Sequence, residues 1–89
     1  MSFHVFYTEQ AQKDLQSLDP QIRRRILKKV AFYTSQKEVE AFTKKLTSPT
    51  KTNLFRFRIG DHRVLFELEK KKKHIIILTI KHRSDVYHR

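Results

Sequence analysis

The first half of the chain changes from an extended pattern of hydrophobic residues to a helical one. Aromatic and β-branched side chains alternate in residues 3–7, which predicts a short strand. Thr8 offers a hydroxyl that can cap a helix, and Ala11, Leu15 and Leu18 then recur at helical spacing over about ten residues. We therefore expect a strand followed directly by a first helix.

A second helix follows closely. Asp19 can cap its amino end, and Pro20 suits the first helical position because no N–H donor is needed there. Its apolar stripe consists of Ile22, Ile26, Leu27, Val30 and Tyr33. Together the two helices form a hairpin. Residues 35–53 give mixed signals, and Ser48-Pro49-Thr50 breaks any helical pattern there.

In the second half of the chain the hydrophobic period becomes two. Phe55, Phe57 and Ile59 alternate with Arg56 and Arg58. This alternation predicts a strand with one apolar face and one cationic face.

Two more strands complete the pattern. Gly60-Asp61 suits a two-residue hairpin turn, and residues 62–69 alternate again as a strand. Lys70 to Lys73 form a solvated turn, and residues 74–80 are apolar on both faces, as expected of a central strand. The order β-α-α-β-β-β predicts an α+β fold, with a four-stranded, mainly antiparallel sheet and the helical hairpin on one face.

Length and composition narrow the class of protein. The 89 residues suffice for a single domain, residues 1–89, with one core. Lys and Arg number 20 against 9 acidic residues, a net charge of +11, which favours a polyanionic partner. The absence of cysteine excludes disulfides, thiol nucleophiles and cysteine-based zinc sites. Without a signal peptide or an apolar run of about 18 residues, we expect a cytoplasmic protein with no membrane partner.

The hairpin register brings two arginines together. A two-residue turn places Arg58 directly opposite Arg63. Like charges in such a pair repel each other and destabilise the sheet. An anion bound between them would turn this repulsion into a net attraction. One arginine alone fits the solvated face of a one-sided sheet. Because Arg56 lies two residues away and Glu67 is the only acid nearby, we expect the three guanidinium groups to converge on solvent and hold a phosphate.

The last strand adds one more group to this cationic face. An even number of residues in the lysine turn would place His82 there, and an odd number would place Lys81 there. A lysine would supply a fixed charge, whereas a histidine could carry a proton. Periodicity leaves both alternatives open, because residues 75–80 are apolar on both faces.

Three segments, in this order, resemble the landmarks of the RelE/ParE superfamily of bacterial and archaeal toxins from type II toxin–antitoxin systems. They are residues 55–60 (FRFRIG), 62–66 (HRVLF) and 82–87 (HRSDVY). The resemblance extends over nearly the whole chain and implies a RelE-like fold. It also implies a ribosome-dependent endoribonuclease, an mRNA interferase that cleaves mRNA in the A site and inhibits translation. In such toxins the ribose 2′-OH attacks the adjacent phosphorus, and neither a metal nor another cofactor takes part.

The resemblance also assigns roles to residues. Arg63 matches the arginine that stabilises the transition state, and Tyr87 matches the tyrosine that stacks on or orients the scissile nucleotide. Where this chain has Arg56 and Arg58 the family often has lysine, and arginine cannot lose a proton. The general base is therefore either His82 or Tyr87. The catalytic candidates are Arg56, Arg58, Arg63, Lys81, His82, Arg83 and Tyr87.

Other basic residues are expected to attract RNA phosphates without taking part in the chemistry. They are Arg23, Arg24 and Lys28 on the second helix and Lys70 and Lys72 in the lysine turn. The carboxylates are scattered and suggest no metal site. By the resemblance, the partners are the ribosome with its mRNA and a cognate antitoxin whose acidic, amphipathic segment wraps the toxin.

Two alternatives to an endoribonuclease stay open. One is a ParE-like inhibitor of DNA gyrase without nuclease activity, which shares the fold. The other is a basic RNA-binding module. The dense basic and aromatic set favours RNA cleavage over both.

Overall fold

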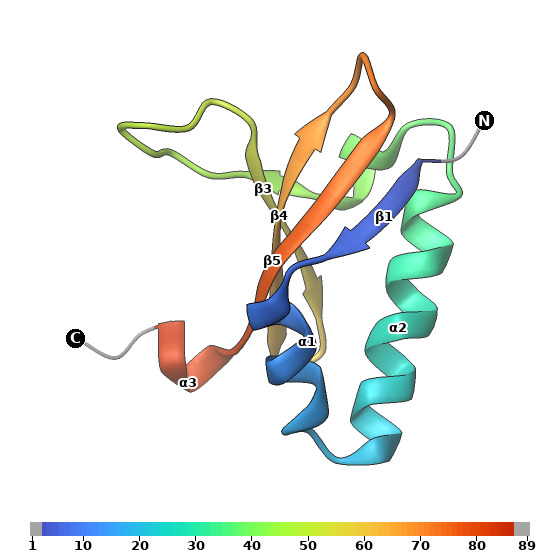
Figure 1. Cartoon of the computed structure of the whole chain (residues 1–89), viewed down its shortest axis with the longest axis vertical. Coiled ribbons are helices and arrows are strands. Elements are labelled where there is room, and N and C mark those ends of the chain that lie inside the picture. Colours follow the sequence, from blue (N-terminus) through green and yellow to red (C-terminus); the bar gives the residue numbers. More distant parts are fainter. Residues whose placement is uncertain (1–2, 87–89) are drawn as a thin grey trace.

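The strands form one mixed sheet (Figure 1). The computed structural model describes residues 3–86, and only the backbone of residues 85 and 86. The strands are β1 (His4–Tyr7), β2 (Lys44–Lys45), β3 (Leu54–Ile59), β4 (His62–Glu69) and β5 (His74–His82). They are arranged in the order β1-β5-β4-β3-β2, with β1 parallel to β5 and the other neighbours antiparallel. The apolar strand β5 is an inner strand with β1 and β4 on its two sides, which agrees with the prediction that it lies inside the sheet.

Within the described residues the sheet has five strands instead of the predicted four. The additional one is β2, in which Lys44 pairs with Arg56 and Lys45 with Phe55. It lies in the segment with mixed signals, where two residues are too few to show a period. This correction adds a short edge strand and leaves the predicted α+β class unchanged.

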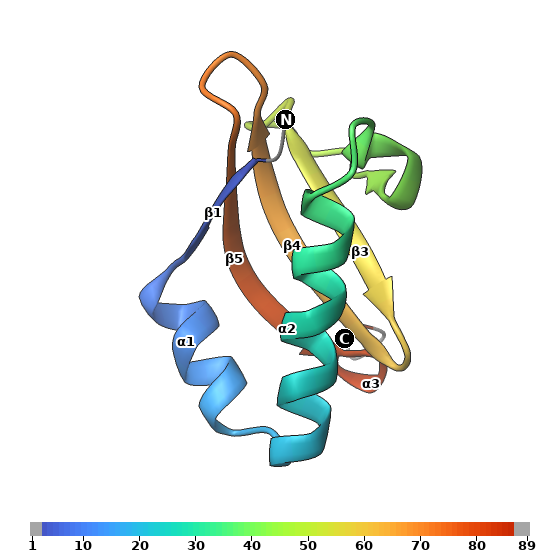
Figure 2. The ribbon, with the colours of Figure 1, turned by 90° about the vertical axis from the view of Figure 1, so that its right-hand side faces the viewer.

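The two long helices cover one side of the sheet. The helical elements are α1 (Glu9–Gln16), α2 (Pro20–Thr34), the 3₁₀ helix η1 (Val39–Phe42) and α3 (Arg83–Val86). Figure 2 shows α1 and α2 side by side in front of the sheet, which confirms the helical hairpin, and α3 lies behind it. We call the covered face the helix side and the opposite face the outer face. No helix among the described residues is long and apolar enough to cross a bilayer.

Both long helices begin at the predicted caps. The Thr8 hydroxyl accepts a hydrogen bond from the Ala11 N–H at 3.1 Å. The Asp19 carboxylate accepts one from the Gln21 N–H at 2.9 Å, and Pro20 occupies the first turn of α2. Each cap satisfies a backbone donor that the helix itself leaves without a partner.

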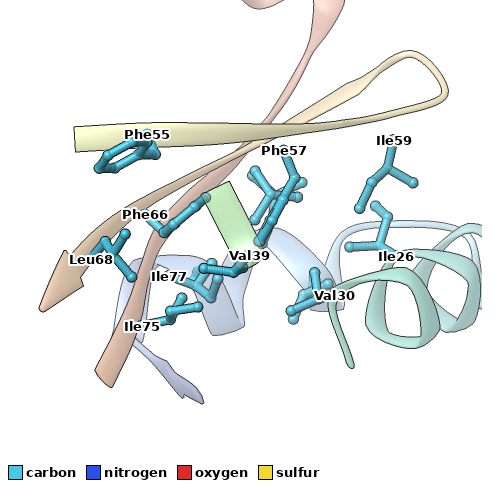
Figure 3. Packing of buried hydrophobic residues seen from close by; sticks show 14 residues of the cluster. Ile26, Val30, Val39, Phe55, Phe57, Ile59, Phe66, Leu68, Ile75 and Ile77 are labelled. Carbon is cyan, nitrogen blue, oxygen red and sulfur yellow. The ribbon is translucent and has the colours of Figure 1, made fainter. Parts of the chain in front are cut away.

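The core lies between the helix side of the sheet and the helices (Figure 3). The rings of Phe57 and Phe66 stack at its centre, with centroids 4.4 Å apart. Their neighbours in the core include Ile26 and Val30 from α2, Val39 from η1 and, from the sheet, Ile59, Val64, Ile75 and Ile77. Because one face of the sheet supplies this core, the other face can carry charge.

The β3–β4 hairpin has the predicted register. Gly60 adopts a φ of 59°, the left-handed conformation that a two-residue turn requires and that glycine adopts without strain. Arg58 consequently pairs with Arg63, and Phe57 with Val64. The predicted cross-strand pair of arginines is confirmed.

A β-bulge interrupts the ladder between β4 and β5. Phe66 pairs with Ile77, but the preceding residue of β4, Leu65, pairs with Thr79. Leu78 is therefore an extra residue in β5. Beyond it, each residue of β5 faces the side opposite to the one that an uninterrupted ladder would give.

Removal of the Phe57 ring is expected to leave a cavity at the centre of the core. We predict that Phe57→Ala lowers the free energy of unfolding by about 3–5 kcal/mol, measured by urea denaturation. Phe32→Ala is the matched control, because this ring is 53% exposed, and its effect should be about 1 kcal/mol or less. Equal losses in the two variants would contradict the packing.

Candidate functional site

Three basic residues lie side by side on the outer face of the sheet. Arg58 of β3 is opposite Arg63 of β4, and Arg63 is opposite Lys81 of β5. Neighbouring strands are about 4.8 Å apart, so the three side chains leave the backbone within about 10 Å of each other. We call Arg58, Arg63 and Lys81 the cationic row. It lies at the end of the sheet that carries the β3–β4 turn.

The members of the row differ in exposure. Arg58 and Lys81 are exposed, whereas Arg63 in the middle is only 6% exposed. Arg63 also interacts with other groups of the protein. The expectation that all the arginines converge on solvent is therefore wrong for Arg63, which occupies an inner strand with neighbours on both sides. Arg63 is a fixed, desolvated charge between two solvent-exposed ones.

The bulge decides which residue of β5 joins the row. The lysine turn contains an even number of residues, because Glu69 pairs with His74. By the sequence argument His82 would then lie on the outer face. It does not: the extra residue Leu78 reverses the alternation, and Lys81 lies there instead. The length of the turn alone does not determine the face of Lys81, because the bulge lies within β5.

His82 lies on the helix side beside His62. The two ring centroids are 5.1 Å apart, and His62 is buried. Nδ1 of His82 accepts a hydrogen bond from the Ser84 N–H at 3.1 Å and is 2.9 Å from the Ser84 hydroxyl. Because Nδ1 acts as an acceptor, the neutral ring carries its proton on Nε2.

Of the remaining catalytic candidates, Arg56 and Arg83 lie near the row. Arg56 lies on the outer face two residues before Arg58 and is half-buried. Arg83 is exposed at the start of α3, and its N–H donates to the Asp61 carbonyl at 2.6 Å. That bond holds the start of α3 against the β3–β4 turn. Tyr87 lies outside the described residues.

The predicted RNA-binding residues lie apart from the row. Arg24 and Lys28 are exposed on α2, which packs on the other side of the sheet, and Arg23 is half-buried there. Lys70 and Lys72 belong to the β4–β5 turn, at the opposite end of the sheet from Gly60. The structure therefore places these cations on separate surfaces from the candidate site.

Among the side chains that the structure describes, few acids lie near the row. Glu67, on the outer face, forms a salt bridge with Lys51. No described carboxylate is within salt-bridge distance of Arg58 or Lys81. Within residues 3–86, no three side chains of the metal-ligating types come together in a group that could hold a metal ion.

Asp14 is a neighbour of the row that the sequence did not indicate. Its Oδ2 accepts hydrogen bonds from the Thr79 hydroxyl at 2.5 Å and from the Ile80 N–H at 2.9 Å. Burial by itself raises the pKa of Asp14, but these bonds, another from Gln10 and the charge of Lys81 outweigh it and hold the pKa below its usual value. In the sequence Asp14 is one of several polar residues of α1, and no local pattern distinguishes it.

Comparison with known proteins places the chain in a family. The model of the family described as the ParE toxin of type II toxin–antitoxin systems matches residues 5–87. The chain belongs to this family. It is a type II toxin of the RelE/ParE superfamily, as the resemblance of its segments implied. No curated protein matches the sequence.

Solved structures of related toxins have the same fold. One chain of the RelBE2 toxin–antitoxin complex from Mycobacterium tuberculosis is 25% identical, with a TM-score of 0.82 over 93% of this toxin and 100% of that chain. A chain of the RelE–RelB complex from Pyrococcus horikoshii is 33% identical, with a TM-score of 0.75 over 93% of this toxin and 97% of that chain. YoeB from Staphylococcus aureus, at 22% identity and full coverage of both chains, has a TM-score of 0.69 and shows likeness of fold alone.

Acid is expected to weaken the attachment of α1 to β5. Since the pKa of Asp14 is lowered in the folded toxin, its stabilising effect is complete above about pH 4, the ordinary value, and is lost as the pH falls through the folded value. We predict that the free energy of unfolding of the wild type decreases more steeply between about pH 5 and pH 2 than that of Asp14→Asn. Urea denaturation across this pH range measures the free energy of unfolding of both proteins. The same dependence on pH in both would contradict the lowered pKa of Asp14.

Proposed function

We propose that this toxin is a ribosome-dependent endoribonuclease that acts in the cytoplasm and cleaves mRNA in the A site. The cationic row is the observation that carries the proposal. Like charges on neighbouring strands repel, so a sheet selected for stability alone would not favour Arg58, Arg63 and Lys81 in one line. A phosphodiester bound over the row would turn the repulsion into attraction.

The proposed chemistry needs concentrated positive charge. The ribose 2′-OH loses its proton and attacks the adjacent phosphorus, and the P–O5′ bond breaks. The departing O5′ takes up a proton from water, so the products carry a 2′,3′-cyclic phosphate and a 5′-hydroxyl. The pentacoordinate transition state carries more negative charge than the ground state. Cations that are already in place therefore stabilise the transition state more than the substrate. No metal ion is needed for this stabilisation.

Each member of the row has a distinct part in the proposal. Arg58 and Lys81 are exposed and contact the phosphate oxygens from two sides. Arg63, fixed and desolvated between them, adds a charge whose field water screens little. Arg56 and Arg83 extend the positive surface along the RNA.

The proton that leaves the 2′-OH needs an acceptor. Of the two candidates from the sequence, His82 is on the helix side, and its Nδ1 already accepts the Ser84 N–H. We therefore assign the role of general base to Tyr87 rather than to His82.

The same proposal includes two macromolecular partners besides the mRNA. The ribosome contributes rRNA phosphates, which the exposed Arg24 and Lys28 of α2 would contact. A cognate antitoxin with an acidic, amphipathic segment would neutralise the toxin, since the related chains from M. tuberculosis and P. horikoshii come from toxin–antitoxin complexes. Leu27 and Phe32 on α2 are exposed apolar residues beside those cations and suit such a segment.

A second candidate function is inhibition of DNA gyrase. The match to the ParE toxin family favours it, whereas the cationic row favours RNA cleavage. The two functions differ in their products, because cleavage leaves new mRNA 5′ ends and gyrase inhibition leaves mRNA intact.

The deciding experiment uses ribosomes programmed with a defined mRNA. After incubation with the toxin, mRNA 5′ ends are mapped, and supercoiling by purified gyrase is assayed in parallel. We expect cuts within the A-site codon and normal supercoiling. Intact mRNA together with inhibited gyrase would overturn the proposal.

Loss of one exposed cation of the row should slow cleavage with little effect on folding. We predict that Arg58→Ala lowers the rate of mRNA cleavage by about 10²- to 10³-fold, the usual effect of removing one transition-state donor. Lys37→Ala, the same change of charge at an exposed position between α2 and η1, is the matched control and should change the rate by about threefold or less. Similar losses in the two variants would mean that overall charge, and not the row, sets the rate.

A further inference from the structure

The bulge that brings Lys81 to the row is held by two side chains outside the sheet. The pairing of β1 with β5 ends at Tyr7 and Ile77. Beyond that point the edge of β5 faces α1 instead of another strand. The Thr8 hydroxyl donates to the Leu78 carbonyl at 2.8 Å, and the Thr8 N–H donates to the Ile77 carbonyl at 3.0 Å. Thr8 thus satisfies the backbone on the amino-terminal side of the bulge.

Asp14 satisfies the backbone on the carboxy-terminal side. One of its oxygens accepts both the Thr79 hydroxyl and the Ile80 N–H, and the other accepts the Gln10 amide at 2.8 Å. These bonds fix the carboxylate between α1 and β5. Ile80 directly precedes Lys81, so the carboxylate holds the backbone one residue before the last member of the row.

From this geometry we infer that Asp14 is a positioning residue, which acts through Lys81 by fixing the bulge. This inference rests on the proposed function. If the ladder continued without the bulge, Arg63 would face Ile80, and Lys81 would turn to the helix side. The Asp14 carboxylate stabilises the arrangement in which Lys81 faces the row, and its negative charge also attracts the Lys81 ammonium group.

Substitution of Asp14 is expected to displace Lys81 from the cationic row without unfolding the protein. Ile80 is buried in the core in the bulged arrangement, and its burial favours that arrangement even when the carboxylate is removed. Variants at Asp14 should therefore fold, while the segment around Lys81 becomes more mobile. Small displacements of a group that contacts the reacting atoms are known to lower rates by up to about 10²-fold.

The test compares Asp14→Ala and Asp14→Asn with Asp19→Ala. Asp19 caps α2, where its carboxylate accepts the Gln21 N–H. Its variant therefore matches the change of charge and the loss of a hydrogen bond to a backbone N–H. Single-turnover cleavage is measured on programmed ribosomes at saturating toxin. We expect Asp14→Ala to be about 10- to 100-fold slower with unchanged ribosome affinity. Asp14→Asn should recover most of the rate, because its amide oxygen still accepts the Ile80 N–H, and Asp19→Ala should retain wild-type activity.

A double variant separates positioning from a general structural effect. If Asp14 acts through Lys81, Asp14→Ala should lower the rate no further once Lys81→Ala is present. Equal fold losses from Asp14→Ala with and without Lys81 would overturn the inference, as would equal rates for Asp14→Ala and Asp19→Ala.

Nuclear magnetic resonance distinguishes failure of this inference from failure of the proposed function. In the wild type, contacts between the backbones of Arg63 and Lys81 and slow amide exchange at Ile80 are expected even if no mRNA is cut. In Asp14→Ala the Ile80 amide should exchange at least about tenfold faster, while the Val64 amide in the core stays protected. An Ile80 amide as protected as in the wild type would overturn the positioning role, whatever the toxin acts on.

Discussion

The two long helices, α1 and α2, cover only one face of the sheet, and this constraint determines where every strand places its charges. A strand has two sides, and the side against α1 and α2 must be apolar because nothing else supplies the core. β3 and β4 meet this requirement by strict alternation, which leaves Arg58 and Arg63 on the outer face. β5 is apolar on both sides and therefore has no preferred register of its own. The bulge at Leu78 sets the register of β5, since it places Ile80 in the core and Lys81 beside the arginines.

The row of cations is stable because the rest of the fold holds it in place. The glycine turn aligns Arg58 with Arg63, and hydrogen bonds from α1 to β5 hold the segment that carries Lys81. Repulsion within the row is small compared with burial of the core that these strands share. A site of this kind is positioned before the substrate arrives, as electrostatic stabilisation of a transition state requires.

The sequence was sufficient for the elements that depend on local pattern. The strand periods, the caps Thr8 and Asp19 and the tight turn at Gly60 each follow from neighbouring residues, and so does the Arg58–Arg63 pair. Features that depend on distant contacts were not predictable. β2 is defined by its pairing with β3, the bulge is held by α1, and the burial of Arg63 reflects its inner position in the sheet. The rule that an even number of residues in the lysine turn places His82 on the outer face was wrong for this reason. It counted residues in the turn and could not include a bulge that is stabilised by residues about seventy positions away in the chain.

The central claim is that Arg58 and Lys81 act on one and the same phosphodiester. A double-mutant cycle with Arg58→Ala and Lys81→Ala, measured as single-turnover cleavage on programmed ribosomes, tests this claim most directly. Their backbones are about 10 Å apart, a separation at which independent sites give additive effects. A shared phosphate should couple them, so that the double variant is at least about fivefold faster than the product of the single effects predicts. Strict additivity would show that the two cations act on different groups and would contradict the account.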